Sequence, residues 1–180
     1  MNPTVSITDM MHCRDSRVEL QTAMMIRHHA TVISFCMNIP GAQKTNRLIQ
    51  QAFAVGKKEI LSALSEKTIP ILESHEIHEK TGDEMILCIK ADARIIKEAM
   101  SGIEDTHPIG RIFDIDVITP DGIKLSRCRC RKCLICNRQA QDCARSRRHS
   151  AEELFDRINQ LLIGYFQQAG SVNGKQRKTQ

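Results

Sequence analysis

Apolar and polar residues alternate along most of this chain with either the period of a helix or the period of a strand. Apolar residues three and four positions apart indicate amphipathic helices, and short stretches rich in β-branched residues indicate strands. The predicted elements are a helix over 9–28, a strand over 32–39, a helix over 45–64, strands over 69–78 and 84–90, a helix over 92–101, a strand over 112–117 and a helix that begins at Ser150. This order predicts an α/β fold with one mixed β-sheet flanked by helices.

The length of 180 residues is that of one domain. We assign residues 1–170 to this domain and the polar, basic residues 171–180 to a disordered tail. Residues 1–15 lack a charged start followed by an apolar stretch, and no apolar segment approaches the length of a membrane span. We therefore expect a cytoplasmic protein whose eight cysteines are mostly reduced thiols or metal ligands.

The strand predicted over 112–117 carries the first candidate chemistry. Side chains two positions apart share one face of a strand, so Asp114 and Asp116 lie on the face opposite its apolar residues. Two neighbouring carboxylates repel each other, and Mg²⁺, which prefers oxygen ligands, relieves that repulsion. Mg²⁺ in such a site typically contacts substrate phosphates. The alternative is a half-buried strand with two solvated acids, and the pattern by itself leaves both interpretations open.

Charge is distributed unevenly along the chain. The net charge is +5, but residues 124–148 contain nine basic residues and one acidic residue, which gives them +8 and leaves −3 for the rest. We call residues 124–148 the basic segment. A concentration of positive charge implies an anionic partner: phosphates, nucleic acid or an acidic protein.

The basic segment is also rich in cysteine. Cys133 and Cys136 have the spacing of half a tetrahedral zinc site, which Cys143 and the nearby His149 could complete. The separation between the two halves is short compared with familiar zinc modules. We therefore favour reduced, partly buried thiols packed on the core, and zinc is the alternative.

Five stretches of the chain match one known family. They are Arg14-Asp15-Ser16-Arg17 with Gln21; Ser34-Phe35-Cys36-Met37-Asn38-Ile39-Pro40-Gly41 with Lys44; Ala91-Asp92-Ala93-Arg94; His107-Pro108-Ile109-Gly110-Arg111 and onward to Val117; and Arg131-Lys132-Cys133-Leu134-Ile135-Cys136 with Cys143, Arg145 and His149. In this combination the chain resembles the apo-citrate lyase phosphoribosyl-dephospho-CoA transferases, also called holo-acyl-carrier-protein synthases of citrate lyase. Cys128 and Cys130 are not part of the family pattern.

The resemblance implies a transferase of the nucleotidyltransferase type with a nucleotidyltransferase-like fold. Its substrate would be 2′-(5″-triphosphoribosyl)-3′-dephospho-CoA, and its acceptor a serine of the apo-acyl-carrier (γ) subunit of citrate lyase, with pyrophosphate as the leaving group. Mg²⁺ held by Asp114 and Asp116 would suit this chemistry. Neither a membrane nor nucleic acid is expected as a partner.

The same resemblance suggests roles for individual side chains. Arg111 joins Asp114 and Asp116 as a catalytic residue. The residues expected to bind substrate are Arg14, Arg17, Lys44, His107, Arg145 and Arg148. Within the basic segment, Arg145 and Arg148 are assigned to the triphosphate, and a second group of arginines to docking of the carrier or to no role. The second group comprises Arg127, Arg129 and Arg138.

Two other functions fit parts of the sequence. A haloacid-dehalogenase-like phosphatase also carries an Asp-x-Asp strand, but that strand usually lies near the start of its domain, whereas here only a short, basic and cysteine-rich part of the chain follows Asp116. A basic zinc module that binds nucleic acid would use the +8 charge, but aromatic residues for base stacking make up only 3% of the chain.

Overall fold

The computed structural model describes residues 4–127 and 129–176, with side chains described as far as residue 169. The elements are α1 (Ile7–His28), β1 (Thr31–Met37), α2 (Arg47–Glu66), β2 (Ile71–Glu79), β3 (Gly82–Ile89), α3 (Ala93–Thr106), the 3₁₀ helix η1 (Gly110–Ile112), β4 (Phe113–Ile118), α4 (Ala140–Arg145) and α5 (Ala151–Gln176). All the predicted helices and strands are present. Helix α3 extends beyond its predicted end, α4 was not predicted, and Cys128 lies outside the described residues.

The four strands of the described residues form one sheet in the order β2-β3-β1-β4, and all neighbouring strands are antiparallel. The α/β fold is therefore confirmed, but the predicted mixed sheet is wrong. Each helical crossover joins two strands that run in the same direction, and a third strand lies between them. β3 separates β1 from β2, and β1 separates β3 from β4. These two split β-α-β units form the ferredoxin-like β-α-β-β-α-β arrangement.

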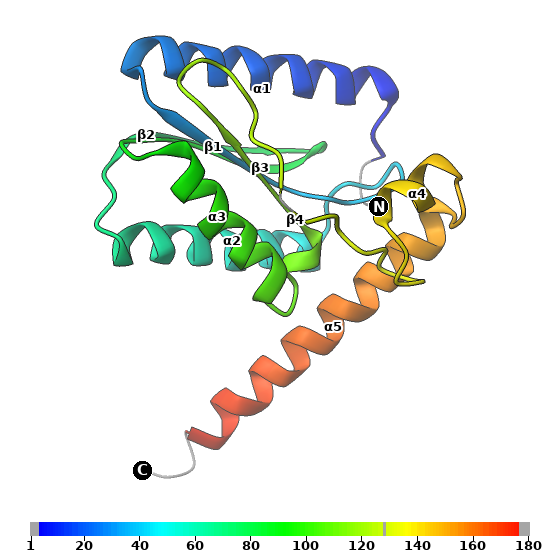
Figure 1. Cartoon of the computed structure of the whole chain (residues 1–180). Coiled ribbons are helices and arrows are strands. Elements are labelled where there is room, and N and C mark those ends of the chain that lie inside the picture. Colours follow the sequence, from blue (N-terminus) through cyan, green and yellow to red (C-terminus); the bar gives the residue numbers. More distant parts are fainter. Residues whose placement is uncertain (1–3, 128, 177–180) are drawn as a thin grey trace.

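Helix α1 lies on one face of the sheet, and α2 and α3 lie on the other (Figure 1). The face toward α2 and α3 holds most of the core. Phe35 of β1 stacks on Phe53 of α2 with ring centroids 5.0 Å apart, and it meets Phe113 of β4 edge-on at 5.6 Å. Gly56 allows α2 to approach this cluster, because a Cβ at that position would lie 2.4 Å from the Phe35 ring.

The face toward α1 changes character along the strands. At one end, α1 packs on a small apolar cluster, formed by Met24, Ala30, Val32, Ile86, Cys88 and Ile118. Further along the same strands, the side chains that alternation places on this face are polar or ionisable, namely Ser34, Cys36, Glu84, Asp114 and Asp116. The sheet therefore presents a polar area beside an apolar one.

The basic segment follows β4 and contains little regular structure. The Leu125 N–H donates to the Val117 carbonyl at 2.9 Å, so the chain first turns back along the open edge of β4. Beyond this turn, the described part of the segment contains only α4 and an isolated bridge between Lys132 and Gln139. Its position therefore depends on contacts of individual side chains.

Helix α5 begins after Ser150, as predicted. Ser150 Oγ accepts from the Glu153 N–H at 3.0 Å, and Glu153 Oε2 accepts from the Ser150 N–H at 2.7 Å, which is a capping box. The helix continues over residues 171–176, which belong to the span predicted as a tail, and residues 177–180 lie outside the described part. Among the described helices, none is both long and apolar enough to cross a membrane.

Candidate active site

Strand β4 presents its two aspartates as the alternation predicts. The apolar residues of the strand are buried, while Asp114 and Asp116 are half-buried on the α1 side. The register places Asp114 opposite Cys36 of β1 and Asp116 opposite Ser34. Positions two apart along a strand are separated by about 7 Å, so the two carboxylates are neighbours on one face.

Ile115, which lies between the two aspartates, is held by α3 from outside the sheet. β4 is an edge strand, so the backbone groups on its outer side need partners that the sheet does not supply. The Ile115 N–H donates to Glu104 Oε1 at 3.0 Å, and the Ile115 carbonyl accepts from Lys97 Nζ at 3.0 Å. Both side chains are buried, and this burial lowers the pKa of Lys97. These contacts fix the strand where its carboxylates emerge.

A third carboxylate lies on the same face of the sheet. Glu84 of β3 is opposite Cys36, which is in turn opposite Asp114, so the three residues form a row across three strands. The buried Glu84 carboxylate accepts from Arg17 Nε at 2.9 Å and from a second nitrogen of the same guanidinium. Arg17 was expected to bind substrate, but in the structure its guanidinium binds Glu84. Asp114 and Asp116 are therefore the carboxylates on this face that no arginine of the described residues binds.

Cys36 lies between these carboxylates as a protonated thiol. Burial raises the pKa of Cys36 to about 12, and the charges of Asp114 and Glu84 act in the same direction against the opposing effect of Arg17. The thiol Sγ lies 3.9 Å from Asp114 Oδ2 and donates to it. Cys36 therefore adds no negative charge to this face.

A cavity of about 490 Å³, which we call the aspartate cavity, opens beside Asp114 and Asp116. Basic side chains outnumber acidic ones in its lining. The charged lining residues are Lys97, Glu104, Arg111, Asp114, Asp116, Lys124, Arg127, Arg129 and Arg131. The positive charge of the basic segment is thus gathered around the two carboxylates predicted to hold a cation.

Two of these arginines are anchored by one buried acid. Arg127 and Arg131 both form ion pairs with the Glu104 carboxylate, whose side chain is only 1% exposed, and Arg127 also pairs with the exposed Asp105. Glu104 therefore joins three parts of the site: the edge of β4, α3 and the basic segment. Its contacts set the directions of both guanidinium groups.

The other cations of the cavity are less constrained. Lys124 Nζ lies 2.5 Å from Asp116 Oδ2, and the lysine side chain is 62% exposed. Arg129 is exposed and forms no ion pair within the part of the chain that the structure describes. Its guanidinium is therefore available to an incoming anion.

Arg111 stands at the boundary of two cavities. Arg111 Nε donates to the Lys132 carbonyl at 2.7 Å. Burial lowers the pKa of Arg111, and the nearby charges of Arg131 and Arg127 contribute to this shift. A second cavity, of about 440 Å³, also contains Arg111 and extends toward α5. The two cavities therefore meet at Arg111.

None of the six residues expected to bind substrate is in the lining of the aspartate cavity. Lys44 donates to a backbone carbonyl after β1 at 2.6 Å, and burial lowers the pKa of Lys44. His107 lies against Phe113 and Tyr165, with ring centroids 5.3 and 5.5 Å apart, on the core side of β4. Arg14 is exposed on α1.

The arginines near Cys143 also differ from expectation in their positions. Arg145 and Arg148 are exposed and line neither of the two cavities, whereas Arg147 lines the second one. Because α4 turns Cys143 inward, Arg145 two positions later lies on the outer side of the helix. Arg129, assigned from the sequence to carrier docking or to no role, lines the aspartate cavity instead.

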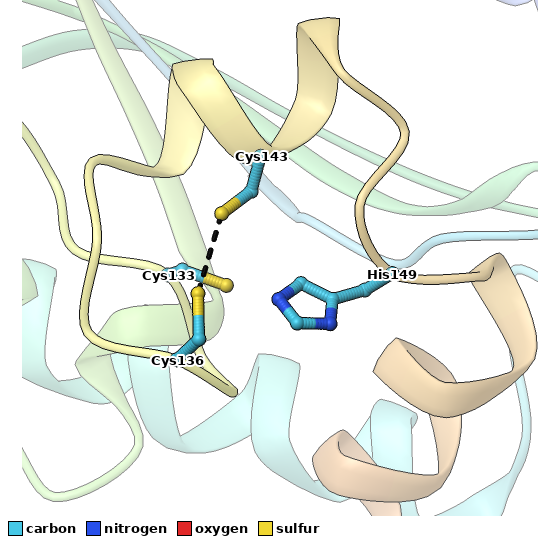
Figure 2. Close-up of side chains that lie close together, drawn as sticks. All are labelled: Cys133, Cys136, Cys143 and His149. Atoms are coloured by element: carbon cyan, nitrogen blue, oxygen red, sulfur yellow. Dashed lines mark hydrogen bonds between the residues drawn. The ribbon is translucent and has the colours of Figure 1, made fainter.

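Cys133, Cys136, Cys143 and His149 meet at one point, with their candidate ligand atoms within 4.8 Å of one another. The first two come from the turn that precedes α4, Cys143 comes from α4, and His149 comes from the loop before α5 (Figure 2). We call these four residues the Cys–His cluster. Among the described residues, no other group of three or more His, Cys, Asp or Glu side chains is gathered in this way.

Sequence reasoning missed Glu84, Lys97 and Glu104. The sequence pattern of an amphipathic helix is the same whether an acid or a lysine on its polar face meets solvent or the edge of a strand. Glu84 likewise stands at the start of a predicted strand, where an exposed acid is ordinary. The only signal that could have found these residues is the strand order, which brings them to β4 and β1.

The split β-α-β sheet with paired carboxylates and several arginines in one cavity defines a single-domain α/β protein with a site suited to a multiply charged anion. The chain belongs to the apo-citrate lyase phosphoribosyl-dephospho-CoA transferase family, whose model matches residues 5–165. The resemblance seen in the sequence is therefore confirmed.

Individual relatives agree with the family match. The chain is 36% identical over 167 residues to a probable apo-citrate lyase phosphoribosyl-dephospho-CoA transferase of Vibrio cholerae serotype O1, which covers 90% of this chain and 94% of the relative. It is 35% identical over 162 residues to the apo-citrate lyase phosphoribosyl-dephospho-CoA transferase of Citrobacter koseri, which covers 88% of each chain. The protein of this name from Escherichia coli O1:K1 is also 35% identical over 162 residues.

Proposed function

We propose that the protein transfers the 2′-(5″-phosphoribosyl)-3′-dephospho-CoA group from its triphosphoribosyl precursor to a serine of the apo-acyl-carrier (γ) subunit of citrate lyase. Membership of the transferase family supports this proposal. The structural observation that carries it is that Asp114, Asp116 and several arginines line one cavity. Sites of phosphoryl transfer from a triphosphate recurrently combine cationic side chains with carboxylates that hold a metal.

The proposed reaction is of the nucleotidyltransferase type. The serine oxygen attacks the phosphorus next to the ribose, a new phosphorus–oxygen bond forms, and the bond to the pyrophosphate breaks. The serine proton leaves, and the product is a phosphodiester. This classification describes the chemistry, and likeness to the nucleotidyltransferase fold stays a prediction.

Asp114 and Asp116 would hold Mg²⁺ in this reaction. Two carboxylates fit this ion, because Mg²⁺ is usually bound by one or two carboxylates together with substrate phosphates. When bound, the ion would neutralise charge on the triphosphate. Lys124 pairs with Asp116 in the structure, and so exposed a pair is worth little. Lys124 can therefore exchange Asp116 for a phosphate oxygen.

The arginines of the aspartate cavity would bind the triphosphate and the leaving pyrophosphate. Arg127 and Arg131 are held in position by Glu104, and Arg111 by the Lys132 carbonyl. Arginines fixed before substrate arrives stabilise developing charge without the cost of reorienting. Arg129 supplies a guanidinium that lacks an ion-pair partner among the described residues.

Transfer is tested by incubating the protein with apo-carrier, the triphosphoribosyl precursor and Mg²⁺. We expect the mass of the carrier to rise by the mass of the prosthetic group, with release of pyrophosphate. A carrier whose acceptor serine is replaced by alanine is the control and should keep its mass. An unchanged wild-type carrier would contradict the proposed function. The comparisons give no support to the phosphatase or the nucleic-acid-binding alternative, and the cytoplasmic location stays a prediction.

A further inference from the structure

We propose that Cys133, Cys136, Cys143 and His149 bind one structural Zn²⁺, which fixes the basic segment beside the aspartates. The four candidate ligand atoms lie within 4.8 Å of one another. A tetrahedral zinc with zinc–sulfur bonds of about 2.3 Å places its ligand atoms about 3.8 Å apart. Small side-chain movements therefore bring all four atoms to coordination distance.

The turn between the first two cysteines has a backbone that supports metal binding. The Cys133 N–H donates to the Arg138 carbonyl at 2.7 Å, which closes a loop around Cys136. The Ile135 N–H points at Cys133 Sγ at 3.4 Å, and an N–H donor stabilises a thiolate ligand. Asn137 has a φ of 59°, a left-handed conformation that asparagine tolerates better than most residues. This loop directs both sulfurs to one side.

His149 provides independent support. Its Nε2 atom is buried and has no hydrogen-bond partner among the residues that the structure describes. A buried polar nitrogen without a partner is costly and calls for an explanation. Figure 2 shows a ring nitrogen of His149 facing the three cysteine sulfurs. A zinc ion bound between them supplies the missing partner, and the fourth ligand that a structural site requires.

A disulfide explains fewer of these observations. Cys136 Sγ and Cys143 Sγ lie 3.4 Å apart, so these two could be oxidised. That bond would leave the buried Cys133 thiol and His149 without a role. Zinc uses all four side chains, and four protein ligands complete a tetrahedral site, which makes the ion structural and not catalytic.

Zinc at this position connects the Cys–His cluster to the aspartate cavity. Lys132, directly before Cys133, gives its carbonyl to Arg111 Nε. Arg131, one residue earlier, pairs with Glu104. The ion therefore holds in place a wall of the cavity that contains little regular structure of its own.

Zinc analysis of the purified full-length chain tests the site. We expect one zinc per chain, and loss of that zinc in Cys136→Ser and in His149→Ala. The matched control is Cys130→Ser, because Cys130 is exposed and lies outside the Cys–His cluster. A wild-type protein without zinc, or a control that loses as much zinc as Cys136→Ser, would overturn the assignment.

Three further measurements on the wild-type protein cover the case in which a variant fails to fold. Cobalt added to metal-free wild-type protein should give the intense visible absorption of tetrahedral thiolate coordination, and one equivalent should saturate it. An intact mass lower by two hydrogens under non-reducing conditions would reveal a disulfide and overturn the zinc site. Removal of zinc should also speed the cleavage of the basic segment by trypsin, because a loosened backbone fits the protease more readily, and an unchanged cleavage rate would overturn the positioning role.

Discussion

The sheet and the basic segment are held together by different means. Behind the sheet, α2 and α3 bury a continuous apolar core. Within it, Phe35 contacts both Phe53 and Phe113. In the basic segment, Leu125 and Leu134 pack against this core, but the rest of its described part is held by ion pairs to Glu104, the contact between Arg111 and a backbone carbonyl, and the Cys–His cluster. Apolar burial is non-directional and spread over many residues. Each polar contact of the basic segment depends on one side chain. Single substitutions should therefore affect the two regions to different degrees.

The proposed site lies where the two regions meet. The sheet supplies the carboxylates at fixed spacing, and the basic segment supplies most of the cations. The carboxylates and the cations come mostly from different parts of the chain, and the fold brings both sets of charges around one cavity. Glu104 is the link, since it contacts the edge of β4 and two arginines of the basic segment.

Glu104→Gln should have the largest effect, because it breaks this link. Glutamine keeps an acceptor for the Ile115 N–H but leaves Arg127 and Arg131 without their buried counter-charge. We expect the free energy of unfolding to fall by about 3 kcal/mol or more. Urea unfolding followed by circular dichroism measures it. Asp105→Asn is the control: this acid is 52% exposed, and its loss should cost less than about 1 kcal/mol. Equal effects of the two variants would contradict the role of Glu104.

Asp114→Asn should leave the sheet intact and remove activity. The side chain is half-buried and shares its face with Asp116, so asparagine fits the same space. We expect the rate of transfer to the carrier to fall about 100-fold or more, as when charge stabilisation is lost at a reacting centre. The measurement is the rate at which the carrier gains mass. Asp121→Asn, in the exposed turn after β4, should keep its rate. Normal transfer by Asp114→Asn would show that the aspartate does not bind the metal.

The sheet was predictable from the sequence to a greater degree than the basic segment. Alternation over 112–117 correctly placed both aspartates on one face, because a strand with one buried face needs that pattern. The antiparallel pairing was not predictable, because no local pattern tells which strand lies between two others. The meeting of Cys143 with Cys133 depends on α4, a helix of six residues too short to leave a periodic signal.

Arg129→Ala should have a moderate effect. It tests whether the triphosphate is bound by Arg129, as the cavity lining indicates, or by Arg145, as the sequence predicted. Arg129 lines the aspartate cavity, whereas Arg145, expected from the sequence to bind the triphosphate, lines neither cavity. We expect Arg129→Ala to weaken binding of the precursor alone about 10-fold, the loss of one charge-assisted hydrogen bond. Calorimetry without carrier measures this. Arg145→Ala is the matched comparison and should bind nearly normally. The reverse order of affinities would restore the assignment made from the sequence.

Glu73→Gln should have the smallest effect, confined to the sheet and the end of α1. Glu73 of β2 accepts from His75, His28 and Arg27, and these contacts lower the pKa of Glu73 to about 2. Its ordinary value is 4.5, so the folded protein holds this proton less tightly than the unfolded chain. The stabilisation is therefore fully present above about pH 4.5 and is lost as the pH falls toward about 2.

This linkage predicts how the melting temperature of Glu73→Gln depends on pH. At pH 7 the variant should melt below the wild type, and the difference should disappear as the pH approaches 2. Glu79→Gln is the matched control, because Glu79 lies on the same strand and forms no ion pair with any described residue. Glu73 lies on the β2 strand, at the far edge of the sheet from β4, so zinc content and precursor binding should stay unchanged. A difference in melting temperature that persists at pH 2 would show that Glu73 acts through packing and not through its charge.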